Sequence, residues 1–183
     1  MARMTIDGYG QVELNNVAFR RDGRIEAQCA LDTTAFTSQV PAENGMILRV
    51  KKAEHKITFA DASADNQLYA LNYSAEHMYD ERKPGLKNFK LDSAVVGKDF
   101  YPRVGYLAAG DLWTTNCIDL GSYASVGAVV SALSSGEVYA AVGTQGAAVL
   151  ADSAPSVGPV IQVIKKTTMP DGTLGVKFQV LTA

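Results

Sequence analysis

Toward its C-terminus the chain reads Val160-Ile-Gln-Val-Ile-Lys-Lys-Thr-Thr-Met169, then Pro170-Asp-Gly172, then Leu174-Gly-Val-Lys-Phe-Gln-Val-Leu181. The return segment alternates, so Val176, Phe178 and Val180 fall on one face and polar residues on the other. Pro-Asp-Gly supplies the fixed φ, the side-chain cap and the positive-φ residue that a tight turn needs. These features predict a β-hairpin.

Outward from this hairpin, short alternating or β-branched runs bounded by turn residues predict more strands. They cover residues 46–52, 56–59, 67–73, 87–91, 101–107, 112–118, 126–133, 137–142 and 147–151. Residues 126–133 are also compatible with a helix. Asp22-Gly23 between two alternating runs predicts another hairpin. Residues 75–83, followed by Pro84-Gly85, are the best short helix candidate.

The predicted fold class is all-β, either a β-sandwich or a small β-barrel, with at most one or two short helices. We expect a β-rich N-terminal part over residues 1–95. A β-meander domain ending in the hairpin would follow over residues 96–183. The boundary near residues 92–100 is suggested by a change in charge pattern, because residues 104–164 contain no lysine or arginine.

Overall composition excludes several classes of protein. The chain has 183 residues, 47% of them hydrophobic, and a net charge of −2, which excludes a strongly basic nucleic-acid binder. No apolar run reaches the roughly 18 residues that a membrane-spanning helix needs. The N-terminal residues do not resemble a secretory signal. We therefore expect no nucleic-acid partner and no membrane partner.

The segment without cations, residues 104–164, holds only the acids Asp111, Asp119, Glu137 and Asp152. Lysine is depleted at protein interfaces, so one interpretation is that much of this segment is buried or faces other subunits. The other is an ordinary β-domain with a surface of small residues.

Catalytic and metal-binding patterns are missing from the sequence. His55 and His77 are the only histidines, and neither forms an HxH or HExxH arrangement. Cys29 and Cys117 have no CxxC spacing, so we expect two free, buried thiols. There is no nucleophile elbow and no phosphate-binding glycine loop. The sequence predicts no catalytic residues, no metal site and no cofactor.

Two basic clusters and one tryptophan are candidates for contact with partners. Arg20 and Arg21 with Arg24, and Lys51 and Lys52 with Lys56, could each touch an acidic partner. Trp113 is better explained as a core or interface anchor than as a platform for sugars.

Residues 101–116, Tyr-Pro-Arg-Val-Gly-Tyr-Leu-Ala-Ala-Gly-Asp-Leu-Trp-Thr-Thr-Asn, resemble auxiliary head proteins of tailed bacteriophages, of the decoration, cement or head-fibre type. The closing Pro170-Asp-Gly172 and Val176-Lys-Phe-Gln-Val180 strengthen this resemblance, which covers about the last 80 residues. It implies a non-enzymatic protein on the capsid exterior that bridges major capsid subunits, often as a trimer or another small oligomer.

Our hypothesis from the sequence is a virion structural protein that contacts the major capsid protein and sister copies of itself. The candidate interface residues are Arg20, Arg21, Tyr101, Arg103 and Trp113. Part of residues 104–164 would pack against sister copies, and the N-terminal half would contact the capsid floor. Alternatives are a tail, collar or fibre-base component, a module that binds carbohydrate or a host surface, and a hydrolase.

Overall fold

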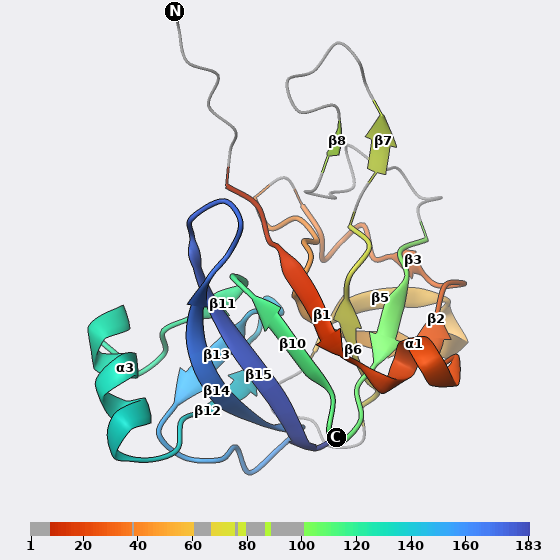
Figure 1. Ribbon diagram of the computed structural model, residues 1–183. Helices are drawn as coiled ribbons and strands as arrows, with labels where there is room; N and C mark the ends of the chain where they lie inside the picture. Colours follow the sequence, from red (N-terminus) through yellow and green to blue (C-terminus); the bar gives the residue numbers. More distant parts are fainter. Residues whose placement is uncertain (1–7, 38, 61–66, 76, 80–86, 89–100) are drawn as a thin grey trace, which may run out of the picture.

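The computed structural model describes residues 8–37, 39–60, 67–75, 77–79, 87–88 and 101–183. These residues form a seven-stranded sheet, a six-stranded sheet and a two-stranded ribbon (Figure 1). The fold is all-β and sandwich-like, and it is not a closed barrel. The predicted fold class is confirmed, and the sandwich is the correct one of its two alternatives.

The larger sheet combines the C-terminal strands with one strand from near the N-terminus. Its spatial order is β1 (Val12–Asn16), β10 (Leu112–Thr115), β15 (Leu174–Thr182), β14 (Val160–Thr168), β12 (Tyr139–Val142), β13 (Ala148–Ala151) and β11 (Ile118–Asp119). β11 pairs parallel with β13, and β10 lies between β1 and β15. The predicted simple meander is therefore wrong, although its closing hairpin β14–β15 is confirmed.

The smaller sheet has the spatial order β2 (Ile25–Glu26), β9 (Val104–Tyr106), β6 (Tyr69–Asn72), β4 (Ile47–Lys51), β5 (Lys56–Phe59) and β3 (Ala30–Leu31). It is buried on both faces. Ile47 and Leu71 join the core shared with the larger sheet, whereas Leu48 and Ala70 join a second cluster with Phe36. This explains why neighbouring residues of its central strands, Ile47 with Leu48 and Ala70 with Leu71, are all fully buried, since a strand covered on both faces has no solvent side.

The core between the two sheets is built around Trp113 and Phe178, which are both fully buried. They face each other across β10 and β15 with ring centroids 5.7 Å apart. The two sheets approach closely at Gly45, where a Cβ atom would lie 1.9 Å from Oγ1 of Thr115. Only glycine fits at this contact, and its φ of 91° also favours glycine.

The hairpin predicted at Asp22-Gly23 is wrong. The structure has a short helix there, α1 (Ala18–Asp22), which ends at Gly23 in the left-handed conformation. The Gly23 N–H donates to the Phe19 carbonyl, as in a helix C-cap. A glycine with positive φ serves a hairpin and a helix end equally well, so the local pattern was ambiguous.

The strand predicted at residues 126–133 is also wrong, and the helical alternative holds. The structure has α3 (Val126–Ser135), which begins where Ser125 Oγ accepts a hydrogen bond from the Ala128 N–H at 3.3 Å. In Figure 1 this helix stands at one side of the larger sheet. The Ser125 cap, with Ala128, Ala132 and Leu133 as good helix formers, outweighs the β-branched valines of this segment.

The helix predicted for residues 75–83 is contradicted at β7 (His77–Tyr79), which pairs with β8 (Lys87–Asn88). Pairing with another strand has overridden the local pattern. The rest of that prediction, beyond Ala75, lies outside the described residues, as do residues 92–100. Both main sheets contain strands from either side of residues 92–100, so the predicted boundary does not separate the two sheets.

Candidate functional site

Four of the five predicted interface residues lie near one edge of the smaller sheet. Arg20 and Arg21 belong to α1, which leads through Gly23 into β2. Tyr101 and Arg103 come just before β9, and β9 pairs antiparallel with β2. α1, β2 and β9 lie together in Figure 1. All four side chains are exposed, and Tyr101 keeps 50% of its surface accessible.

Tyr73 links the two arginine-bearing segments. Burial raises the pKa of its phenol, while the charges of Arg103 and Arg20 both act to lower it. We call Arg20, Arg21, Tyr73, Tyr101 and Arg103 the arginine–tyrosine surface. The sequence placed Tyr73 in a strand but gave no sign that it joins this surface.

The backbone beneath the arginine–tyrosine surface is held by specific contacts. The Phe19 ring packs against Tyr73 at a centroid distance of 5.4 Å. A Cβ atom at Gly105 would lie 2.2 Å from the same Phe19 ring, so the glycine lets α1 approach β9. The Arg103 N–H donates to Ser74 Oγ at 2.7 Å, and that hydroxyl donates to the Arg103 carbonyl at 3.2 Å.

No ion pair joins Arg20, Arg21 or Arg103 to an acid within the part of the chain that the structure describes. Arginine and tyrosine are the residue types that most often dominate binding energy at protein interfaces. The arrangement therefore suits an acidic partner surface, because each planar guanidinium group can donate two parallel hydrogen bonds to one carboxylate.

Trp113 does not belong to this surface. Its side chain is fully buried in the core between the sheets, so it offers no area to a partner in this fold. Its assignment as an interface residue is corrected to the core role that the sequence also allowed.

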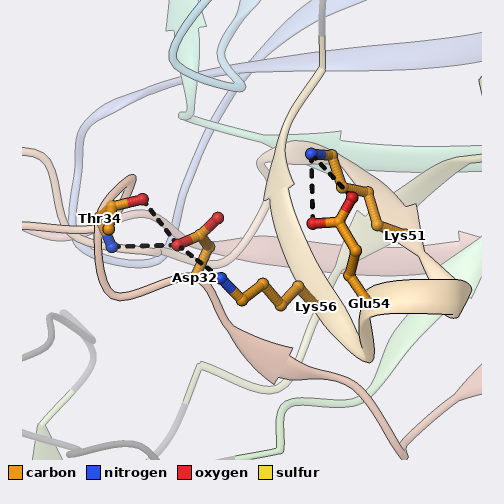
Figure 2. A network of polar contacts seen from close by, with 5 residues as sticks. All are labelled: Asp32, Thr34, Lys51, Glu54 and Lys56. Carbon is orange, nitrogen blue, oxygen red and sulfur yellow. Dashed lines mark hydrogen bonds and ion pairs between the residues drawn. The ribbon is translucent and has the colours of Figure 1, made fainter.

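The second basic cluster of the sequence has a different arrangement, because all three of its lysines meet carboxylates. Lys56 Nζ lies 3.7 Å from Asp32 Oδ1, and Lys51 Nζ lies 3.4 Å from Glu54 Oε1. Figure 2 marks both ion pairs with dashed lines. Asp32 also accepts hydrogen bonds from the N–H and the hydroxyl of Thr34 at 3.0 and 2.8 Å. Burial raises the pKa of Asp32, but the Thr34 hydrogen bonds and the Lys56 charge outweigh it and lower that pKa overall.

The third lysine, Lys52, lies 3.3 Å from the buried carboxylate of Glu26. Glu26 also accepts hydrogen bonds from the N–H groups of Ala27 and Gln28 at 3.1 and 2.8 Å, and from the Tyr106 hydroxyl at 3.1 Å. Burial raises the pKa of Glu26, yet these hydrogen bonds and Lys52 together hold it below its ordinary value. This cluster is a structural tie between β2 and β9.

A third group of cations lies on the closing hairpin. Lys165 pairs directly opposite Lys177, with the exposed Lys166 beside it. β12 pairs with β14 only at Ile161 and Gln162, so the distal part of β14 has a neighbour strand on one side among the described residues. Lysines along such an edge discourage pairing with other strands, and this explains their placement without a ligand.

A cavity of about 520 Å³ lies between the N-terminal segment, the tip of the closing hairpin and β11. It is lined by Gly8, Tyr9, Gly10, Glu43, Met46, Asn116, Cys117, Ile118, Leu120, Ala147, Thr173 and Leu174. No local sequence pattern indicates this cavity, since its walls come from five separate parts of the chain.

Asn116 and Glu43 fix the polar wall of the cavity. Asn116 Oδ1 accepts from the Gln11 N–H at 2.6 Å, and its Nδ2 donates to the Tyr9 carbonyl at 3.0 Å and to Thr173 Oγ1 at 3.2 Å. Glu43 Oε2 accepts a hydrogen bond from the Gly10 N–H. These bonds tie the N-terminal segment to the body of the protein.

The two cysteines are free, as the sequence predicted, with Cys29 buried and Cys117 half-buried. Burial and the nearby Glu43 charge raise the pKa of Cys117 to about 12. Burial also raises the pKa of Cys29. Both thiols are therefore protonated at neutral pH, and a protonated thiol is a poor nucleophile.

The histidines do not assemble a catalytic group in the described part of the chain. His55 is exposed and directly follows the short helix η1 (Lys52–Glu54). The structure describes the backbone of His77 but not its side chain. Within the described ranges there is no cluster of three or more histidine, cysteine, aspartate or glutamate side chains that could hold a metal ion. Nor do these ranges contain a helix long and apolar enough to cross a membrane.

Comparison with protein-family models, with curated proteins and with solved structures finds no match for this chain.

Proposed function

We propose that this chain is a non-enzymatic virion structural protein that decorates and reinforces the outer capsid lattice by bridging major capsid subunits. The observation that carries the proposal is the arginine–tyrosine surface, which presents arginines without acidic partners among the described residues. The resemblance of residues 101–116 and 170–180 to phage auxiliary head proteins supplies the kind of partner.

The chemistry elsewhere in the molecule supports a role that works by contact. Buried carboxylates accept hydrogen bonds that hold the fold: Asp111 takes the N–H groups of Ala18 at 2.6 Å and Ala108 at 2.8 Å. Glu26 is held by its backbone and tyrosine donors in the same way. These groups serve structure, and the thiol that lines the cavity is protonated.

A surface of five side chains need not bind tightly at each site. Specific protein interfaces bury roughly 1,200–2,000 Å² in total, and smaller contacts are usually weak. On a lattice, however, a particle offers many equivalent sites, and linked contacts gain strength through effective concentration. Modest attraction between arginines and shell carboxylates therefore suffices to cover a capsid.

Contact with sister copies is proposed for the segment without cations, residues 104–164. Its helix α3 has no acidic or basic residue and exposes 41% of Val130, while Ile164 exposes 42%. Val130→Lys and Ser131→Lys, which place a cation on this exposed face, are expected to weaken self-association in analytical ultracentrifugation. Unchanged sedimentation would remove α3 from the proposed contact.

The test of the proposed function is the ratio of this chain to the main shell protein in purified particles, measured by gel densitometry. A decoration protein is expected at a copy number comparable with that of the shell protein. A low copy number would instead indicate a collar, tail or fibre-base component. Absence from particles would contradict any virion role.

A further inference from the structure

The cavity beside the N-terminal segment has one charged residue in its walls. Among its lining residues, Glu43 alone carries a formal charge at neutral pH. The polar neutral groups of Asn116 and Thr173 are engaged with each other at 3.2 Å. A hollow of about 520 Å³ is large enough to hold a side chain or a small organic molecule.

Glu43 is placed to interact with an occupant of this cavity. Its Oε2 atom accepts the Gly10 N–H, and no ion pair joins the carboxylate to a cation within the described residues. Its charge acts on Cys117, which lines the same cavity. One carboxylate oxygen is thus left for an incoming donor.

The remaining walls are largely apolar. Met46 is 7% exposed, and Ile118, Leu120 and Leu174 are half-buried around the hollow. Such walls favour methylene groups over a hydrated ion. An occupant with an apolar stem and a cationic end matches both features, as lysine does when its stem is buried and its charge is held at the rim.

We propose that this cavity binds a primary alkylammonium group, the end of a lysine side chain or a free alkylamine, with Glu43 as its counter-ion. An ammonium fits better than a guanidinium because Gly10 already occupies one carboxylate oxygen, and a guanidinium prefers both. The inference goes beyond the proposed function and does not depend on it.

The test is calorimetric titration of the full chain with three probes. They are Nα-acetyl-lysine methylamide, its uncharged counterpart Nα-acetyl-norleucine methylamide, and 1,5-diaminopentane. The lysine probe is expected to bind, and the norleucine probe about tenfold or more weakly, because it lacks the ammonium. Binding of diaminopentane as well would show that the amine alone suffices, and its failure would point to a lysine within a polypeptide.

Glu43→Gln is expected to weaken binding of the lysine probe by about tenfold or more. A glutamine oxygen can still accept the Gly10 N–H, so the fold is preserved, and thermal unfolding checks this. The matched control is Glu13→Gln, which removes an exposed carboxylate on β1 and should leave binding unchanged.

Equal binding of the norleucine and lysine probes would overturn the proposal, and this comparison uses the unmodified chain. Undiminished binding by a folded Glu43→Gln variant would overturn it too. So would the absence of any binding at millimolar probe. None of these results bears on the copy number of the chain in particles, so the two proposals fail separately.

Discussion

Two groups of basic residues that look alike in the sequence occupy opposite electrostatic settings in the fold. Lys52 and Lys56 each lie within 3.7 Å of a carboxylate, those of Glu26 and Asp32. In the other cluster Arg24 forms an ion pair with the exposed Asp22 at 3.8 Å, but Arg20 and Arg21, like Arg103 on the neighbouring segment, form none among the described residues. A basic cluster in sequence therefore indicates neither a binding surface nor a structural network until its partners are known.

The largest effect is expected at the paired group, where Glu26→Ala should lower the free energy of unfolding by about 2 kcal/mol. The reason is that the Gln28 N–H and the Tyr106 hydroxyl lose their acceptor near the core. Urea denaturation measures this. The control is Glu54→Ala, an exposed partner of Lys51, which should change stability by less than about 0.5 kcal/mol. Equal decreases for the two substitutions would contradict the structural importance of the buried Glu26 carboxylate relative to the exposed Glu54 carboxylate.

The paired group should also make stability depend on pH. The pKa values of Glu26 and Asp32 are lowered in the folded state from ordinary values of 4.5 and 3.8. A carboxyl group with a lowered pKa stabilises the fold above its unfolded value, and this contribution is lost as pH falls through the folded value. Stability should thus fall from about pH 5 downward.

Urea denaturation across this pH range gives the measurement. Glu26→Gln and Asp32→Asn should each flatten the decline, because the substituted group no longer takes up a proton on unfolding. A decline that keeps the same slope in both variants would assign the acid sensitivity to other carboxyl groups.

The smallest effect on stability is expected at the unpaired group. Arg20→Gln with Arg103→Gln should change the free energy of unfolding by less than about 0.5 kcal/mol, since no ion pair is lost. Thermal unfolding at low and high salt checks this. Lys56→Gln serves as the comparison and should lower the free energy of unfolding by up to about 1 kcal/mol. This decrease should be smaller at high salt, which screens the ion pair. A larger decrease in the free energy of unfolding for the arginine variant would mean that these arginines stabilise the fold.

Sequence patterns were sufficient to predict an element where all the signals within one segment indicate the same structure. The closing hairpin was predicted because alternation and Pro170-Asp-Gly172 agree on the same structure. The prediction failed where one signal suits two structures, as Gly23 does at a helix end or a hairpin turn. It failed again at α3, where Ser125 and the small residues that follow allowed both a helix and a strand.

The candidate site could be predicted only as separate residues. Arg20 and Arg103 were identified, but the pairing of β2 with β9 that brings their segments together depends on long-range register. Trp113 was predicted as an interface residue, but it is buried in the core. An isolated tryptophan in a sequence is compatible with either position. The role that we propose for Glu43 depends on a cavity that no local pattern encodes.

The most direct test of the central claim is cosedimentation of the purified chain with particles that lack it. We expect the unmodified chain to bind the shell and the Arg20→Glu, Arg103→Glu variant to bind about tenfold or more weakly. Lys165→Glu with Lys166→Glu changes the net charge by the same amount on the closing hairpin and should leave binding intact. Equal loss in both variants, or undiminished binding by the arginine variant, would contradict docking through the arginine–tyrosine surface.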